Sequence, residues 1–349
     1  MLSASAWGDA MKRLMMVVAL ICAMPAVARD LPVPADKGWQ HAPTGVILTR
    51  QLAGMSRTTL TDATETEHDV AAQFELPDKS VFATIYIFKS PVADAALWFD
   101  RSRTALEARD IYRHAAPATI DPVAFAAGAA RSASALRQVY AVPDGPYRST
   151  ALAVVPVGAW IVAIRMSAKT LTADRLNGRL TDVIGAIRWP AESGNPIPIA
   201  VPVKTCAVPL AFPRSKLAKA NGADTLMSLL GSRVAGENAT ITPARPKTWC
   251  REGDAYPHYG VYRADAGVNG YIMALADAGR VVSVFPSLMG QVDDTGTYAV
   301  SLQDVDGTTF AYPSFTAMPR PEQVRDVVLG DHTDGNSKDG RIKGDSKAF

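Results

Sequence analysis

The chain has 349 residues, 48% of them hydrophobic and 20% charged, which is typical of a folded protein with an apolar core. Lys and Arg total 36 against 34 Asp and Glu, giving a formal net charge of +2. Consecutive Lys or Arg residues never exceed two. Because proteins that bind nucleic acid or anionic membranes carry basic clusters, this composition argues against both as main partners.

The N-terminal region has the three parts of a secretory signal peptide. Met11-Lys12-Arg13 is basic, residues 14–24 are uncharged and largely apolar, and Ala26-Val27-Ala28 has small residues at its first and third positions. Eleven residues are too few to span a bilayer as a helix. We therefore expect residues 11–28 to be a signal peptide cleaved between Ala28 and Arg29, export to the periplasm or the extracellular space, and residues 1–10 to be a mis-assigned start.

The three cysteines divide between the signal peptide and the mature chain. Cys22 lies in the signal, and the preceding Ile21 is not the small residue that lipid attachment requires. Cys206 and Cys250 remain, and in an oxidising compartment a lone pair favours a disulfide. Two cysteines without a CxxC spacing do not make a zinc site.

Residues 38–190 are expected to form an α+β domain. Residues 80–88 (SVFATIYIF) are apolar on both faces and rich in β-branched and aromatic residues, as in a covered central strand. Helices are expected at 91–109, opened by Pro91, and at 172–188, with apolar residues at helical spacing. Further strands are expected at 46–52, 68–76, 136–142, 147–155 and 160–167.

This order of elements over about 40–190 resembles the PsbP/Mog1-like α/β sandwich. The resemblance is carried by the SVFATIYIF strand, the helix with Trp98-Phe99 that follows it, and the closing IGAIRWP segment. It is a resemblance of pattern and brings no catalytic motif. Because members of that fold group mostly act as accessory or assembly factors, it implies a non-catalytic role.

A second α+β domain is expected at 205–330, after a Pro-rich linker at 191–204. Six prolines between Pro190 and Pro213 cannot be accommodated in one helix and remove donors from any central strand. A helix is expected near 217–230, followed by an antiparallel meander whose turns contain Asp and Gly, and a short helix after Pro321. The polar, Gly-rich residues 331–349 are expected to be a disordered tail.

The chain lacks the common catalytic motifs. The nearest approach to G-x-S-x-G is Gly54-Met55-Ser56-Arg57, which has no second glycine, and neither a Walker loop nor H-E-x-x-H is present. An acidic group is the candidate metal or acid–base site: Glu65, Glu67 and Asp69 would share one face of an extended chain and would suit Ca²⁺. The alternative, which the sequence favours, is a solvated strand end.

An aromatic group is the candidate binding site. Trp249, Tyr256, His258, Tyr259 and Tyr262 could recognise a sugar or a protein partner. The alternative is a disulfide-tethered loop whose aromatic side chains pack on their own sheet.

The sequence thus predicts an exported, non-catalytic accessory or binding protein that acts on a cell-envelope protein or component and carries no cofactor. Two alternatives remain open. One is a secreted hydrolase whose carboxylates come together only in the fold, which for a glycosidase requires only two of them. The other is a solute-binding protein whose ligand lies between the domains at the Pro-rich joint.

Overall fold

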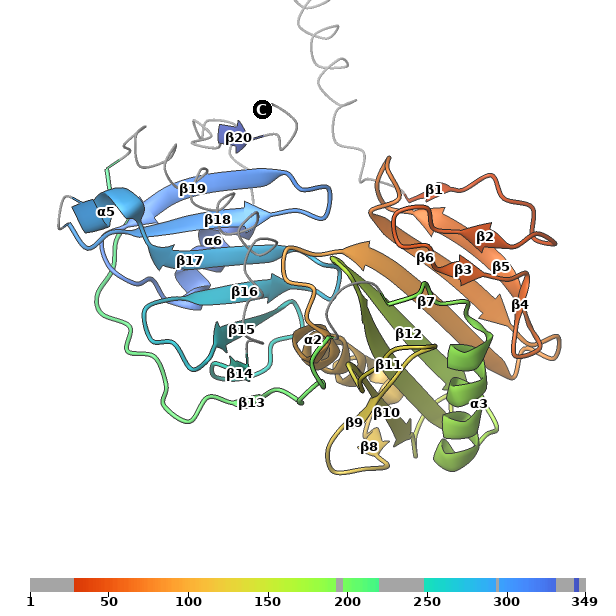
Figure 1. Ribbon diagram of the computed structural model, residues 1–349. Helices are drawn as coiled ribbons and strands as arrows, with labels where there is room; N and C mark the ends of the chain where they lie inside the picture. Colours follow the sequence, from red (N-terminus) through yellow and green to blue (C-terminus); the bar gives the residue numbers. More distant parts are fainter. Residues whose placement is uncertain (1–27, 193–196, 220–247, 293–294, 331–341, 345–349) are drawn as a thin grey trace, which may run out of the picture.

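The computed structural model describes residues 28–192, 197–219, 248–292, 295–330 and 342–344 (Figure 1). The regular structure in these residues is mostly antiparallel sheet with few helices, so the fold is α+β with sheet predominating. Two large sheets are accompanied by a small one made of β2 (Trp39–Gln40) and β3 (Ile47–Leu48). The predicted signal peptide up to residue 27, with Cys22, lies outside the described residues.

The first large sheet is centred on β7 (Val81–Lys89), which pairs with β6 (Asp69–Glu75) on one side and β12 (Trp160–Ala168) on the other. This confirms the central strand predicted at 80–88. The other strands extend the sheet outward on both sides. They are β1 (Arg29–Asp30), β4 (Gln51–Leu52), β5 (Met55–Asp62), β8 (Ala116–Pro117), β9 (Val123–Phe125), β10 (Ala135–Ala141) and β11 (Ser149–Val157).

Strand β5 is the longest element that the sequence prediction missed. Its residues MSRTTLTD are largely polar and lack the β-branched, apolar pattern of the other long strands. Buried Arg57 donates to the carbonyls of Val33 and Pro34, and buried Asp62 accepts from Arg29. These polar residues are stabilised by tertiary partners, which local sequence does not reveal.

The two faces of the first sheet are covered by different elements, because side chains alternate along each strand. On β7, Ala83, Ile85 and Ile87 join the cluster that includes helix α3 (Ala173–Ala186). Phe88 and Tyr86 lie on the opposite face, in or against the cluster that includes helix α2 (Ala95–Glu107). Both predicted helices are present. α2 begins at Ala95 rather than Pro91, because the Asp94 side chain accepts from Ala96 and Leu97 and caps the first turn.

In the second large sheet each strand pairs with the next along the chain, antiparallel as predicted except for the parallel pair of β13 and β14. Helix α6 (Pro321–Leu329) packs Val324 and Val328 against it, confirming the helix expected after Pro321. A short helix, α5 (Leu288–Val292), follows the fifth strand. The strands are β13 (Lys204–Thr205), β14 (Trp249–Arg251), β15 (Tyr259–Ala264), β16 (Tyr271–Leu275), β17 (Val281–Pro286), β18 (Tyr298–Gln303), β19 (Thr309–Phe315) and β20 (Ile342–Gly344).

Three other expectations fall wholly or partly outside the described residues. The helix predicted near 217–230 does not begin at Leu217, which forms an isolated β-bridge with Phe315, and its remainder from 220 is not described. Residues 197–203 of the predicted linker are neither helix nor strand. Of the predicted tail, residues 342–344 form β20 against β19, and the rest is not described.

Helix α2 lies between the two large sheets and joins them (Figure 1). One hydrophobic cluster contains Trp98 and Phe99 of α2, residues of β11 and β12, and Tyr262 and Ile272 of the second sheet. The two halves therefore share buried core in addition to their own clusters. Within the described chain, no helix is both long and apolar enough to cross a membrane.

Candidate functional site

A buried polar network fixes the two halves against each other. The Arg101 guanidinium of α2 donates to the carbonyl oxygens of Tyr256, Pro257 and Ala276 at 2.8–2.9 Å. Ser90, just after β7, donates to the carbonyl of Gly279 at 3.1 Å. Arg101 is fully buried, so its positive charge is stabilised by these carbonyls rather than by water. Because Arg101 and Ser90 of the first half both donate to backbone carbonyls of the second half, these hydrogen bonds fix the position of the second sheet relative to the first.

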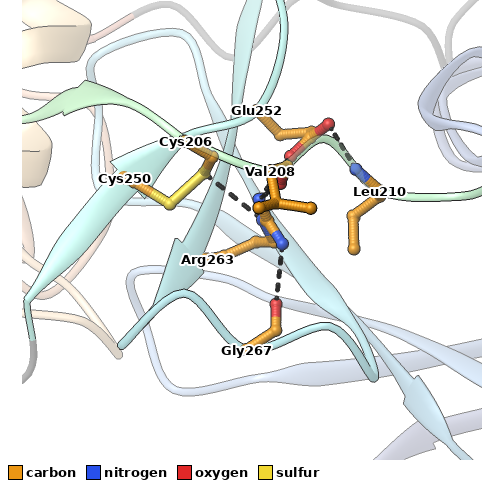
Figure 2. The surroundings of a disulfide bond; sticks show 7 residues. All are labelled: Cys206, Val208, Leu210, Cys250, Glu252, Arg263 and Gly267. Atoms are coloured by element: carbon orange, nitrogen blue, oxygen red, sulfur yellow. Dashed lines mark hydrogen bonds and ion pairs between the residues drawn. A yellow bond between two sulfur atoms is a disulfide. The ribbon is translucent and has the colours of Figure 1, made fainter.

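The predicted disulfide between Cys206 and Cys250 is present, and it lies in a second buried network (Figure 2). Arg263 donates to Cys206 Sγ at 3.3 Å and to the Gly267 carbonyl at 3.1 Å, and forms an ion pair with Glu252 at 3.0 Å. Glu252 also accepts from the Leu210 backbone at 2.8 Å. These contacts tie the segment after β13 to the edge of the second sheet. With both sulfurs bonded, neither is a nucleophile.

The five residues of the predicted aromatic site do not share one surface. Tyr262 is fully buried and donates to Asp100 at 2.8 Å, and Tyr259 is in the core of the second sheet. Trp249 is half-buried, whereas Tyr256 and His258 are exposed. Tyr256 stacks on Tyr259 with ring centroids 4.9 Å apart. Tyr259 and Tyr262 therefore pack internally, whereas Tyr256 and His258 remain at the surface.

The predicted acidic group is also divided. Residues 63–68 are a series of bends in which Glu67 has a φ of +59°, so the extended geometry assumed for a shared face is absent. Glu65 is exposed, and Asp69 is the first residue of β6. Among the described residues, no three His, Cys, Asp or Glu side chains gather as a metal ion would require. Asp69, however, points into a cavity.

This cavity, of about 340 Å³, lies between the two halves. Its floor is the face of the first sheet that carries Asp69, Tyr86 and Arg165. One wall is Ser102 of α2 with Arg109, just beyond the helix end, and the other is the β16–β17 turn with Asp277 and Ala278. Ala28, Thr61, Ala63, Ala71, Phe88 and Ala163 complete the lining. A volume at the lower end of the range for ligand pockets suits a small molecule.

The cavity is lined by a carboxyl group, Asp69, and by an ion pair of Arg165 and Asp277. Burial raises the pKa of Asp69 to about 6, an effect that Arg280 opposes and that Asp62 and Asp304 reinforce. Arg165 forms an ion pair with Asp277, and its guanidinium lies 5.3 Å from the centre of the Tyr86 ring. Burial lowers the pKa of Arg165 from its ordinary value. Asp69 can therefore change its charge near neutral pH inside this cavity.

Two buried polar atoms in the cavity wall have no hydrogen-bond partner in the described structure: Ser102 Oγ and Arg165 Nε. Ser102 is 1% exposed, so water in bulk does not reach its hydroxyl. Leaving a buried polar group without a partner costs about 1–3 kcal/mol. Because both atoms have almost no exposed surface, a molecule in the cavity would not reach them. The cavity is the candidate functional site for another reason: Asp69, Arg109, Arg165 and Asp277, from four separate segments, line it.

A second cavity, of about 270 Å³, lies at the Pro-rich joint. Residues 197–201, the start of α2, and Trp249 line it. Its buried carboxylate, Asp94, already accepts from Ala96, Leu97 and Trp249. Because the polar groups here are used internally, this cavity offers less for a ligand than the first.

Comparison of the chain with models of known protein families, with curated proteins and with solved structures finds no match. The site therefore has to be interpreted from its own chemistry.

Sequence reasoning identified Asp69 but not Ser102, Arg109, Arg165 or Asp277. One signal was available: Arg165 is the only charged residue in the strand WIVAIRMSA, and a charge in an otherwise buried strand requires a partner. Asp277 was interpreted as a turn residue, which it is. Its pairing with Arg165 depends on how the second sheet docks on the first, and this is not encoded in local sequence.

Proposed function

We propose that this chain is an exported, non-catalytic binding protein, that its target is a component of the cell envelope, and that the cavity between the halves is its ligand site. Its first half would be a PsbP/Mog1-like sandwich and its second half a separate domain of the same chain. The antiparallel order of the first sheet, with α2 and α3 on opposite faces, supports the sandwich. The disulfide supports export.

One observation carries the proposal: four charged side chains from four separate segments, Asp69, Arg109, Arg165 and Asp277, line one cavity between the halves. The contacts of Arg101 and Ser90 hold the cavity open by fixing the second sheet at a set distance from the first. A pre-formed, small cavity that is largely apolar and carries a few charged groups is suited to binding.

The test is native mass spectrometry of the protein purified from the compartment to which it is exported. We expect a small molecule to be retained by the wild type and lost from Ala71→Phe, which adds a ring to the cavity lining. Ala299→Phe, on β18 of the second sheet, is the matched control and should retain it. Absence of any retained or rebound small molecule in the wild type would refute the proposal.

A hydrolase is the second candidate, because Asp69 and Asp277 line the same cavity in different surroundings. Carboxyl groups whose environments separate their pKa values can act as acid and base. This version predicts that a captured ligand is slowly cleaved by the wild type and persists intact in Asp69→Asn. A ligand whose mass is unchanged in both proteins after prolonged incubation would leave binding alone.

A further inference from the structure

We propose that the disulfide between Cys206 and Cys250 is a redox-sensitive switch at the junction of the two halves. A thiolate of a dithiol reductant attacks Cys250 Sγ, and Cys206 leaves as a thiolate that Arg263 stabilises. Reduction removes the covalent link between β14 and the chain that enters the second half, and so loosens the junction.

The first observation is a buried cation beside one of the two sulfurs. The Arg263 guanidinium donates through Nε to Cys206 Sγ at 3.3 Å (Figure 2). Arg263 is 2% exposed, so bulk water does not screen its charge. A cation in contact with a sulfur stabilises the thiolate, and in thiol–disulfide exchange the sulfur with the more stable thiolate leaves faster. Cys206 is therefore the favoured leaving group.

The carboxylate of Glu252 opposes this effect only in part. It pairs with Arg263 through Nη2 at 3.0 Å, and it also accepts from the Leu210 backbone at 2.8 Å. The Arg263 side chain has five N–H donors in a fixed plane, so one edge serves Glu252 while Nε faces the sulfur. The N–H directed at Cys206 thus remains available to a thiolate.

The second observation is the difference in access to the two cysteines. Cys206 is buried at 8% exposure, whereas Cys250 is half-buried. The rate of exchange depends on which sulfur an attacking thiolate can reach. Access therefore selects Cys250 as the sulfur attacked, and the cation selects Cys206 as the sulfur released. The two arguments are independent and give the same direction of reaction.

The reaction balances with a dithiol as the only co-reactant. One thiolate of the reductant bonds to Cys250 Sγ, the bond between the two protein sulfurs breaks, and its electron pair leaves on Cys206. The second thiolate of the reductant then attacks the mixed disulfide, forms the reductant's own disulfide and releases Cys250 as a thiolate. Protons lost from the reductant balance those gained by the two protein thiols. The dithiol is oxidised by two electrons and the protein is reduced by two.

Strand β14 is where the second half is attached to helix α2. Trp249 hydrogen-bonds to Asp94, the residue that caps α2, and Arg251 pairs with Asp100 of the same helix. Cys250 lies between these two contacts in a strand of three residues. The disulfide therefore acts on the strand that carries both links to α2.

The other end of the disulfide is close in sequence to the first half. Ala200 donates to the carbonyl of Ala133 at 2.9 Å, and Cys206 follows six residues later. Strand β13 pairs with β14 over only two residues, and the Cys206 backbone donates to the Arg251 carbonyl at 2.9 Å. A parallel pair this short contributes little by itself. Once the disulfide is reduced, we expect β14 to separate from β13 more often and its contacts with α2 to weaken.

The direction of attack is tested on the full-length mature protein with glutathione as the probe. Early samples are quenched in acid, the freed thiol is alkylated, and peptide mass spectrometry reports which cysteine carries glutathione. We expect glutathione on Cys250 and the alkyl group on Cys206. Glutathione on Cys206, or on both cysteines equally, would overturn the assignment of the leaving group.

Single-cysteine variants test the role of the cation directly. The thiol of Cys206 in Cys250→Ser should ionise below about pH 8.5, the midpoint of an unperturbed cysteine. Cys206→Ser is the matched variant, and its Cys250 thiol should ionise at a higher pH. The rate of alkylation as a function of pH measures both. The reverse order would refute the role of Arg263.

Reduction kinetics with dithiothreitol test the same contact in the intact disulfide. Replacing Arg263 and Glu252 together by Gln removes the pair without leaving a buried charge unpaired. We expect this variant to be reduced about tenfold more slowly, because the leaving thiolate has lost its cation. Arg214→Gln removes an exposed positive charge from the same half and should be reduced at the wild-type rate. Equal rates in all three proteins would contradict the proposal.

Hydrogen exchange tests whether reduction acts as a switch. In the reduced wild type, amides of β14 and α2 should exchange faster than in the oxidised protein, whereas those of β7, in the middle of the first sheet, should not change. Unchanged exchange in β14 and α2 would overturn the switch even if the direction of attack is correct. Faster exchange throughout the protein would overturn it as well, because it would indicate global unfolding.

Discussion

Asp100 of α2 and Arg251 of β14 form a buried ion pair that joins the two halves, with Arg251 Nη1 2.9 and 3.0 Å from the two carboxylate oxygens. The Asp100 side chain is 3% exposed and also accepts from Arg103 and Tyr262 at 2.8 Å each. One carboxylate therefore pairs with two arginines and accepts from a buried phenol. The sequence distance of 151 residues shows that this contact depends on the docking of the second sheet.

Removing the Asp100 carboxylate should lower the free energy of unfolding of the protein. Asp100→Ala leaves the buried Tyr262 hydroxyl and the half-buried Arg251 without their acceptor, and breaking such a pair costs up to about 3–5 kcal/mol. Urea unfolding followed by tryptophan fluorescence measures the loss. Asp110→Ala, which disrupts an exposed pair with Arg113, should change stability by less than about 1 kcal/mol. Equal effects of the two substitutions would contradict the role assigned to Asp100.

The disulfide should contribute measurably to stability. Cys206 and Cys250 are separated by 44 residues, and closing a loop of that length is worth about 4 kcal/mol in the chain-entropy account. Replacing both with Ser also removes the sulfur that accepts from Arg263. We expect the double variant to unfold at lower urea concentration, and the wild type in reductant to behave similarly. An unfolding midpoint unchanged in both cases would refute this prediction.

Asp69→Asn should stabilise the protein at neutral pH. A carboxyl whose pKa rises from 3.8 to about 6 on folding binds its proton more tightly in the folded state. The wild type therefore loses stability as pH rises from about 4 to about 6, and the loss then levels off. The advantage of the variant should be small at pH 4 and reach on the order of 3 kcal/mol above pH 6. Thermal unfolding across this range measures it, with Asp110→Asn as the control for removing a charge. A difference that does not vary with pH would show that Asp69 is not perturbed.

Gly279 should be required where the β16–β17 turn meets the first sheet. Its φ is +85°, and a Cβ there would collide with the carbonyl oxygen of Lys89. Gly279→Ala combines backbone strain with this clash and should displace the cavity wall that contains Asp277. Gly158→Ala is the matched control, because Gly158 also has a positive φ, +59°, but no atom lies near its Cβ position. The control should cost about 1 kcal/mol and Gly279→Ala distinctly more, by urea unfolding. Equal costs would show that the close approach to Lys89 is unimportant.

Local pattern was sufficient to predict most elements of the fold. Strand β7 was identified from its β-branched and aromatic residues, and α3 from the stripe of Leu176, Leu180, Val183 and Ile184 that the structure buries. Strand β5 was missed because its burial of Arg57 and Asp62 relies on distant partners. Patterns report periodicity and composition, so they are informative where a strand or helix buries apolar side chains.

The site was less accessible from sequence for the same reason. Asp69 was singled out because it lies in an acidic stretch, yet its importance comes from burial opposite the second sheet. Arg109, Arg165 and Asp277 are far apart in sequence and line one cavity only in the folded chain. Local pattern does not show that arrangement.

The central claim is that the cavity between the sheets binds a small molecule. The most direct measurement is a crystal structure of the exported protein purified without ligand removal. We predict density for a small molecule in the cavity, in contact with the lining residues Asp69 and Arg109. A cavity containing only solvent, or a ligand bound elsewhere on the protein, would contradict it.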